Sequence, residues 1–168
     1  SILRILLIHA VILTIGGIPL FYLGDEVGTL NDYSYRNDPA KAHDSRWVHR
    51  PIADWEKIAK RREPQSVEGR IYTGFQQLIE LRKANAAFAG GEMQVIRTDS
   101  PHVLGYVRSH AAQRILVFAN FSEETQTLPA NLLRLYGLGY QYTDLLTQQP
   151  FPLQDFQLRP FQFLCLKS

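Results

Sequence analysis

The sequence predicts a mixed fold, in which one α/β unit is followed by an antiparallel β-sandwich. Two observations lead to this prediction. Residues 18–23 are a continuous apolar run between two helical patterns, which is typical of a strand buried on both faces of a parallel sheet. From Gly90 onward, short β-rich segments alternate with turn-prone stretches, which is typical of an antiparallel sandwich.

The composition is that of a folded globular protein. The 168 residues are 45% hydrophobic and 20% charged, and the formal net charge is +2. No run of Lys or Arg suggests a nucleic-acid partner or an anionic membrane surface. The one cysteine, Cys165, has no partner for an internal disulfide, which fits a reducing, cytoplasmic compartment.

The N-terminal apolar stretch predicts a helix and a strand rather than a membrane span. Residues 2–23 are long and apolar enough to suggest a span. However, Arg4 is costly in lipid, and the pair Gly16-Gly17 with Pro19 divides the stretch. We therefore expect a helix over 2–14, a tight turn and a buried strand over 18–23, with no membrane contact.

A long irregular segment and a second helix complete the α/β unit. Residues 24–68 are rich in Asp, Asn, Ser and Pro, and connections of this length are usually functional when they are ordered. We expect a short helix within them, at about 55–62. Residues 69–85 place Ile71, Phe75 and Leu78 on one face, which predicts an amphipathic helix.

The remainder of the chain predicts the sandwich. We expect strands over 94–98, 103–108, 115–121, 126–128, 141–146 and 157–166. The pattern changes between Asn85 and Gly91, so we expect residues 1–88 to belong to the α/β part and residues 89–168 to the sandwich.

Two acids follow the predicted strand directly. In α/β barrels the active site lies at the carboxyl ends of the strands, so Asp25 or Glu26 could face a substrate. The alternative, which we favour from chemistry alone, is that they tie down the loop by hydrogen bonds. They are a poor catalytic pair, because neighbouring residues leaving a strand point to opposite faces.

An arginine next to a tryptophan occupies the middle of the loop. Arg46 carries a planar fork of donors suited to a carboxylate or to sugar hydroxyls, and Trp47 can stack on a sugar ring. The alternative is a structural ion pair with a packed tryptophan, and chemistry alone leaves the two readings even. The five histidines show no metal-ligand spacing, so we expect neither a metal nor a cofactor.

Several segments resemble one enzyme family. Residues 17–26 (GIPLFYLGDE) resemble the motif on the eighth barrel strand of the α-amylase family. Residues 27–32 and 44–51 resemble the narrower group of amylosucrases and sucrose hydrolases. Residues 105–108 and 118–122 resemble the C-terminal domain of that group. Leu23 stands where many amylases carry a tyrosine, a departure that amylosucrases share.

The resemblance implies a TIM barrel followed by a C-terminal β-sandwich. The family's catalytic nucleophile, acid/base and third acid lie on the fourth, fifth and seventh strands, and all would precede Ser1. We therefore expect this chain to be a C-terminal piece, with the last β/α unit of the barrel, no catalytic residue and no activity alone. Its direct partner would be the remainder of the barrel.

The resemblance also implies a substrate and a site. The residue matching Arg46 lies at the floor of the sucrose pocket and pairs with an acid from elsewhere in the barrel. The candidate substrate-binding residues are thus Arg46, Asp25, Glu26 and Trp47. The expected activity is retaining glucosyl transfer from sucrose to an α-glucan or to water. The alternatives are a sucrose hydrolase, another α-glucosidase, or a stand-alone carbohydrate-binding or structural module without catalysis.

Overall fold

The computed structural model describes residues 2–168, and these form two compact units. The larger unit contains residues 3–20 and 75–168, and the smaller one contains residue 2 and residues 21–74. The expected domain boundary after residue 88 stays a prediction. The first helix groups with the β-rich half because hydrogen bonds join them, such as that between Thr14 and Tyr106.

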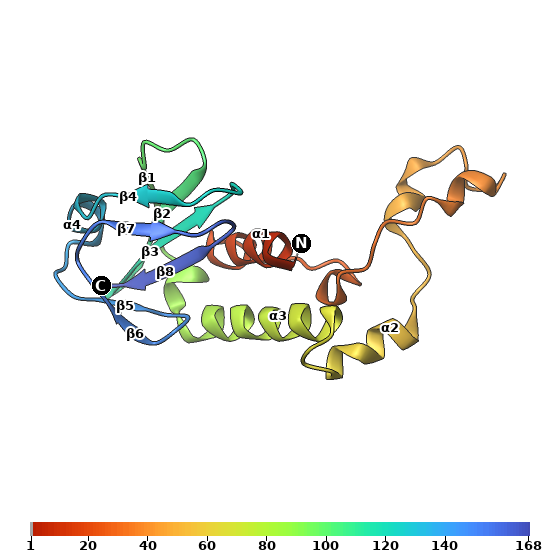
Figure 1. The fold of residues 1–168 in the computed structure, drawn as a ribbon, viewed down its shortest axis with the longest axis horizontal. Helices are drawn as coiled ribbons and strands as arrows, with labels where there is room; N and C mark the ends of the chain where they lie inside the picture. Colours follow the sequence, from red (N-terminus) through yellow and green to blue (C-terminus); the bar gives the residue numbers. More distant parts are fainter. Residues whose placement is uncertain (1) are drawn as a thin grey trace. The chain divides into compact units, whose positions relative to one another are not determined.

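The β-rich half is an antiparallel sandwich of two sheets (Figure 1). The larger sheet has the order β1-β2-β3-β8-β5-β6, and β4 pairs with β7 in the smaller one. The strands are β1 (Glu92–Ile96), β2 (Val103–His110), β3 (Gln113–Asn120), β4 (Gln126–Leu128), β5 (Tyr142–Asp144), β6 (Gln149–Phe151), β7 (Phe156–Leu158) and β8 (Phe163–Lys167). Every pairing is antiparallel, as the sequence predicts.

The end of the chain differs from the prediction of one strand over 157–166. Two strands occupy this region, and they belong to different sheets. Pro160 has no N–H for a ladder, and Phe161 has a φ of 55°, so the chain turns between β7 and β8. The short strand β6 was not predicted.

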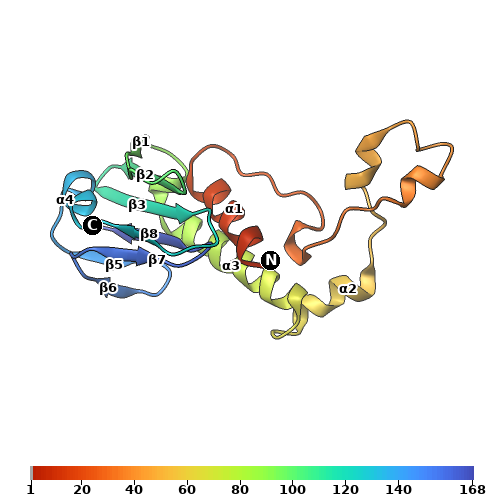
Figure 2. The same ribbon diagram turned by 45° about the horizontal axis from the view of Figure 1, so that its top comes forward.

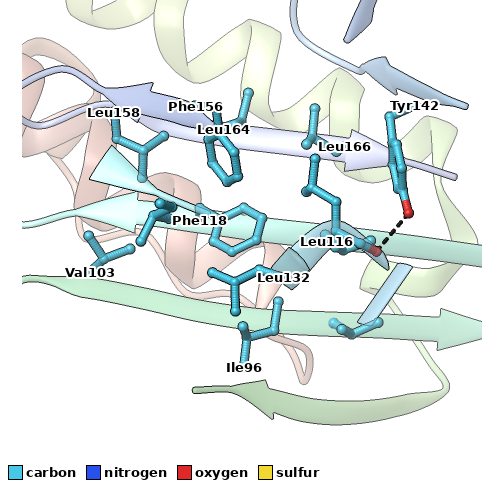
Figure 3. Close-up of a cluster of buried hydrophobic side chains, with 13 residues drawn as sticks. Ile96, Val103, Leu116, Phe118, Leu132, Tyr142, Phe156, Leu158, Leu164 and Leu166 are labelled. Atoms are coloured by element: carbon cyan, nitrogen blue, oxygen red, sulfur yellow. Dashed lines mark hydrogen bonds between the residues drawn. The ribbon is translucent and has the colours of Figure 1, made fainter. Parts of the chain in front are cut away.

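The main hydrophobic core lies between the two sheets (Figure 3). The rings of Phe118 and Phe156, one from each sheet, meet edge to face with centroids 5.4 Å apart. The Tyr142 hydroxyl donates a hydrogen bond to the Leu133 carbonyl at 2.7 Å, drawn as the dashed line in Figure 3. This bond ties helix α4 (Asn131–Gly137) to the sheet.

The central strand β3 is buried on both faces. Leu116 and Phe118 belong to the core between the sheets. Ile115 and Val117 alternate with them and are also fully buried, so they lie on the opposite face of the sheet. The helical part of this unit covers that face, because Tyr106 of β2 bonds to Thr14. Because both faces of β3 are buried, its sequence is a nearly continuous apolar run.

Three segments cover the second face of the large sheet. They are α1 (Ile2–Thr14), the second half of α3 (Val67–Ala84) and the short turn η5 (Ala86–Phe88). Figure 2 shows α1 and this half of α3 together beside the sheet. The rings of His9 and Phe75 join the two helices, with centroids 4.4 Å apart. Both helices lie within two residues of the predicted ranges 2–14 and 69–85.

The expected strand over residues 18–23 is not formed, so that prediction is wrong for this chain. Ile18, Leu20 and Leu23 are instead 98%, 84% and 78% exposed. A strand of a parallel sheet needs hydrogen-bonding neighbours, and every strand within residues 2–168 lies in the antiparallel sandwich. The segment therefore has the composition of a buried strand but no sheet to join.

The smaller unit is a chain of short helical turns. They are η1 (Asp25–Val27), η2 (Ser34–Asn37), η3 (Ser45–His49), α2 (Trp55–Ala59) and η4 (Lys60–Arg62). The last two occupy the place of the predicted short helix. The Asp54 side chain starts α2 by accepting a hydrogen bond from the Lys57 N–H at 3.0 Å. Across the described residues, no helix is long and apolar enough to cross a membrane.

Candidate functional site

The two acids after the apolar run hold the backbone of a tight turn. An Asp25 carboxylate oxygen accepts a hydrogen bond from the Tyr22 N–H at 3.1 Å. A Glu26 carboxylate oxygen accepts one from the Gly24 N–H at 2.8 Å. Gly24 has a φ of 102°, and a Cβ there would lie 2.7 Å from the Thr29 hydroxyl, so the turn requires glycine. These contacts fit the alternative in which Asp25 and Glu26 tie down the loop by hydrogen bonds.

Asp44 and Arg46 form a two-pronged ion pair in the loop. Arg46 Nε donates to Asp44 Oδ1, and Arg46 Nη2 donates to Asp44 Oδ2, both at 2.9 Å. The Asp44 carboxylate also caps the turn η3 by accepting from the Arg46 backbone N–H at 3.0 Å. The hydrogen bonds from the Arg46 side chain and backbone lower the pKa of Asp44 to about 2, so this carboxylate is charged at neutral pH.

The ion pair leaves one edge of the arginine available. A guanidinium group carries five N–H donors, and Asp44 takes the edge formed by Nε and Nη2. The opposite edge, with the two Nη1 hydrogens and the second Nη2 hydrogen, points away from Asp44. The Arg46 side chain is 76% exposed, whereas that of Asp44 is 20% exposed. The pair can thus offer a fixed fork of donors to a carboxylate or to neighbouring hydroxyls.

Trp47 lies next to two cations. Lys41 Nζ is 5.0 Å from a Trp47 ring centroid, and the Arg50 guanidinium carbon is 5.6 Å from it. Both distances are within the range of cation–π attraction. The arrangement gives Trp47 a structural role in the loop, and its stacking on a sugar ring stays a prediction.

The loop holds its shape through contacts between its own turns. The Asp32 backbone N–H donates to the Val48 carbonyl at 2.9 Å. His49 Nδ1 and Asn31 Oδ1 lie 3.2 Å apart. These bonds bring residues 31–32 to the turn that carries Arg46, so the loop segments 27–32 and 44–51 meet in the structure.

Within this chain Arg46 has a local acidic partner, and the expected partner from elsewhere in the barrel stays a prediction. The structure pairs Arg46 with Asp44, two residues before it. A local signal for this partner exists in the sequence, since an Asp at a turn commonly accepts from the backbone N–H two residues on. The side-chain pair follows once that turn is formed.

The described residues contain no obvious metal site. No group of three or more His, Cys, Asp and Glu side chains is arranged to hold a metal ion within residues 2–168. Cys165 is fully buried in β8, and burial raises the pKa of its thiol well above its ordinary value. It is therefore not a reactive thiolate.

The sandwich is similar to a known domain family. Residues 93–164 match the family model described as "Maltogenic Amylase, C-terminal domain". The match begins within β1 and ends within β8, so it extends across the two sheets.

Two curated relatives show how much of a longer protein this chain represents. It is 28% identical to a trehalose synthase of Thermus thermophilus over an alignment of 170 positions, which covers 87% of this chain and 17% of that protein. It is 29% identical to an oligo-1,6-glucosidase of Bacillus cereus over 103 residues, or 58% of this chain and 17% of that protein. The chain thus spans less than a fifth of the length of either relative.

The same fold occurs in a solved structure. The trehalose-6-phosphate hydrolase of Bacillus licheniformis superposes with a TM-score of 0.72 over 98% of this chain and 38% of its own, at 20% identity. At this identity the likeness is one of fold.

Proposed function

We propose that this chain belongs to an enzyme of the α-amylase family, a retaining glucosyltransferase or hydrolase that acts on sucrose. Its residues 93–164 match the maltogenic amylase C-terminal domain, which supports the family. The chain contributes the sandwich and the loop of residues 24–68. The catalytic carboxylates belong to the rest of the barrel. The acceptor of the glucosyl group is an α-glucan, as in amylosucrases, or water.

The observation that carries the proposal is the geometry of Arg46. Asp44 binds one edge of its guanidinium group and leaves the other edge as a fork of N–H donors. Such a fork can hold a pair of neighbouring hydroxyls, or a carboxylate that itself shapes a sugar pocket. The loop that carries Arg46 follows the segment that resembles the eighth barrel strand, and active sites of barrels are built from such loops.

The chemistry is a double displacement. A carboxylate attacks the glucosyl carbon of sucrose while an acid protonates the fructosyl oxygen, and the bond between glucose and fructose breaks. The resulting glucosyl-enzyme then transfers glucose to a glucan hydroxyl or to water. In this scheme Arg46 binds or shapes the glucosyl pocket and exchanges no proton.

The relatives support the broad class, and the loop motifs support the substrate. Trehalose synthase, oligo-1,6-glucosidase and trehalose-6-phosphate hydrolase are all named for chemistry on glucosides. None of these names refers to sucrose. The choice of sucrose depends on residues 27–32 and 44–51, which resemble amylosucrases and sucrose hydrolases.

A non-catalytic carbohydrate-binding or structural module is the second candidate. The sandwich favours it, because it has its own core between two sheets. The backbone contacts of Asp25 and Glu26 also fit a purely structural loop. The two candidate functions differ in whether the protein must also contain a barrel. Only an enzyme needs a barrel with acids at its strand ends.

The test is an assay of the full-length protein, produced with the sequence that precedes Ser1. We expect release of fructose from sucrose, with glucan growth when glycogen is added, or free glucose if water is the acceptor. Trehalose and isomaltose serve as comparison substrates, and turnover of either in place of sucrose would contradict the assignment. The 168-residue chain alone is the control. We expect it to be inactive, because loss of the attacking group removes most of the rate.

A further inference from the structure

Arg82 of α3 binds three backbone carbonyls near the end of α1. Its Nη1 donates to the carbonyls of Leu13 and Phe88 at 2.6 and 2.8 Å. Its Nη2 donates to the Gly17 carbonyl at 2.7 Å. The last carbonyls of a helix have no partner within the helix and lie at the negative end of its dipole, so a guanidinium group there is favourable.

Arg108 of β2 approaches the same turn from the sheet. It is 5% exposed, and it donates from Nε to the Ala87 carbonyl at 2.9 Å and from Nη2 to the Gly90 carbonyl at 2.5 Å. Its guanidinium group lies against Gly16, where a Cβ would come within 3.2 Å of both Nη atoms. Gly16 also has a φ of 121°, so both space and backbone conformation select glycine.

The two arginines thus enclose the Gly16-Gly17 turn from two elements. Hydrogen bonds from a charged donor are about twice as strong as neutral ones, and a buried setting reduces competition from water. The apolar segment 18–23 begins directly after the Gly16-Gly17 turn and ends at Gly24, where the turn that contains Asp25 and Glu26 begins. The Gly16-Gly17 turn is therefore the fixed point at which the segment 18–23 starts.

We propose that Arg82 and Arg108 are positioning residues, through which the sandwich and α3 fix the Gly16-Gly17 turn and so direct the apolar segment 18–23 that follows it. This inference rests on the proposed function, in which residues 18–23 join a barrel. Both arginines bond to backbone carbonyls. Each acts through the backbone of the turn, so the C-terminal domain takes part in building the active site.

A purely structural role makes a different prediction. If the arginines only hold α1 against the sandwich, their loss lowers stability and leaves the kinetics of the folded protein normal. A positioning role changes the rate, because a misplacement of about 1 Å at a site can cost about a hundredfold. The kinetic constants and the stability of the same variants therefore separate the two roles.

The variants are Arg82→Lys, Arg108→Lys and Gly16→Ala in the full-length protein. Lysine keeps the charge but loses the planar fork that joins two carbonyls. Gly16→Ala acts on the turn from the other side, by pushing against the Arg108 guanidinium. Arg97→Lys is the matched control, because Arg97 is on the same sandwich, with its side chain 88% exposed and paired with Asp99.

We expect kcat for sucrose to fall about tenfold to a hundredfold in each variant, with a smaller change in KM. Arg108→Lys combined with Gly16→Ala should cost less than the product of the two single effects, because both act on one contact. Arg97→Lys should match the unmodified protein. A normal kcat in all three variants, with or without a lower Tm, overturns the proposal.

Hydrogen exchange provides a readout that does not need activity. We expect faster amide exchange over residues 15–23 in the three variants, under conditions where the sandwich stays protected. If the unmodified full-length protein does not cleave sucrose, the proposed function fails, while the exchange result still tests whether the arginines fix the turn. Unchanged exchange over residues 15–23 counts against it.

Discussion

The hydroxyl groups of Thr14 and Tyr106 lie 2.6 Å apart in a buried contact that joins helix α1 to strand β2. The Thr14 hydroxyl donates to the Ala10 carbonyl at 2.6 Å, so Tyr106 is the donor between the two. Thr14 is 0% and Tyr106 1% exposed, so water cannot replace the bond.

Tyr106→Phe should therefore lower the free energy of unfolding of the chain by about 1–2 kcal/mol, because it leaves a buried acceptor without its donor. Urea unfolding followed by circular dichroism measures the change. Tyr140→Phe is the control, since Tyr140 is 84% exposed, and it should have little effect. Equal stabilities for the Tyr106 variant and the unmodified chain would contradict the role of this bond.

Phe118→Ala should destabilise the sandwich strongly. Phe118 is fully buried between the sheets and meets the ring of Phe156 edge to face. Truncation of a buried phenylalanine costs about 3–5 kcal/mol, from lost burial and the cavity left behind. Val95→Ala in β1, at a side chain that is 63% exposed, should change stability by less than about 0.5 kcal/mol. Similar losses in the two variants would show that the sheets do not pack as described.

Stability should fall in alkaline solution. Burial raises the pKa of the Tyr106 hydroxyl and of the Cys165 thiol above their ordinary values of 10.0 and 9.0. Above pH 9 the unfolded chain loses these protons first, whereas the folded chain keeps them. The stability they contribute is therefore fully present below pH 9 and declines as the pH rises, by up to about 1.4 kcal/mol per pH unit for each group.

Unfolding measured between pH 7 and pH 11 tests this expectation. Cys165→Ala removes one of the two groups, so its stability should decline less steeply with pH, whatever its stability at pH 7. A constant free energy of unfolding from pH 8 to pH 11 would show that the two groups titrate alike in the folded and unfolded chains.

Arg46→Lys and Arg46→Ala should each lower kcat/KM for sucrose at least about tenfold in the full-length protein, equivalent to about 1.4 kcal/mol of transition-state stabilisation. Lysine keeps the charge, but it cannot bind Asp44 with one edge and a ligand with the other. The Tm should move little, because the Arg46 side chain is 76% exposed. Steady-state kinetics and thermal melts of the same preparations provide both readouts.

Arg36→Lys is the control for the loop, because Arg36 lies in the same unit and its guanidinium carbon is 5.2 Å from the Tyr33 ring centroid. It should keep normal kinetics. If both Arg46 variants instead lose stability and keep normal sucrose kinetics, then Arg46 braces the loop and does not serve the substrate pocket.

Local patterns in the sequence determined much of the secondary structure. The predicted helix over 2–14 forms as α1, and the apolar spacing over 69–85 becomes most of α3. The expected strands over 103–108 and 115–121 form as β2 and β3. These elements are predictable because their periodicity repeats over many residues, and because adjacent strands pair across a short turn.

The candidate site was predictable only in part. Residue chemistry pointed to Arg46, and the resemblance suggested its pocket, but Asp44 emerged as its partner only once η3 had formed. The contacts of Asp25 and Glu26 with the turn at Gly24 likewise depend on backbone conformation. A sequence pattern shows which donors and acceptors are present, but it does not show which of them meet.

The sequence by itself determined helix α1 and most of α3, the long strands β2 and β3, and the antiparallel, β-rich character of the C-terminal half. The tertiary structure alone decided that residues 18–23 stay unpaired, that β7 and β8 join different sheets, and that Arg82 and Arg108 meet at one glycine turn. The physical reason is the separation along the sequence between the residues that interact. Helical periodicity depends on neighbours three or four residues away, whereas sheet pairing and the burial of a charged group depend on partners brought together by the whole fold.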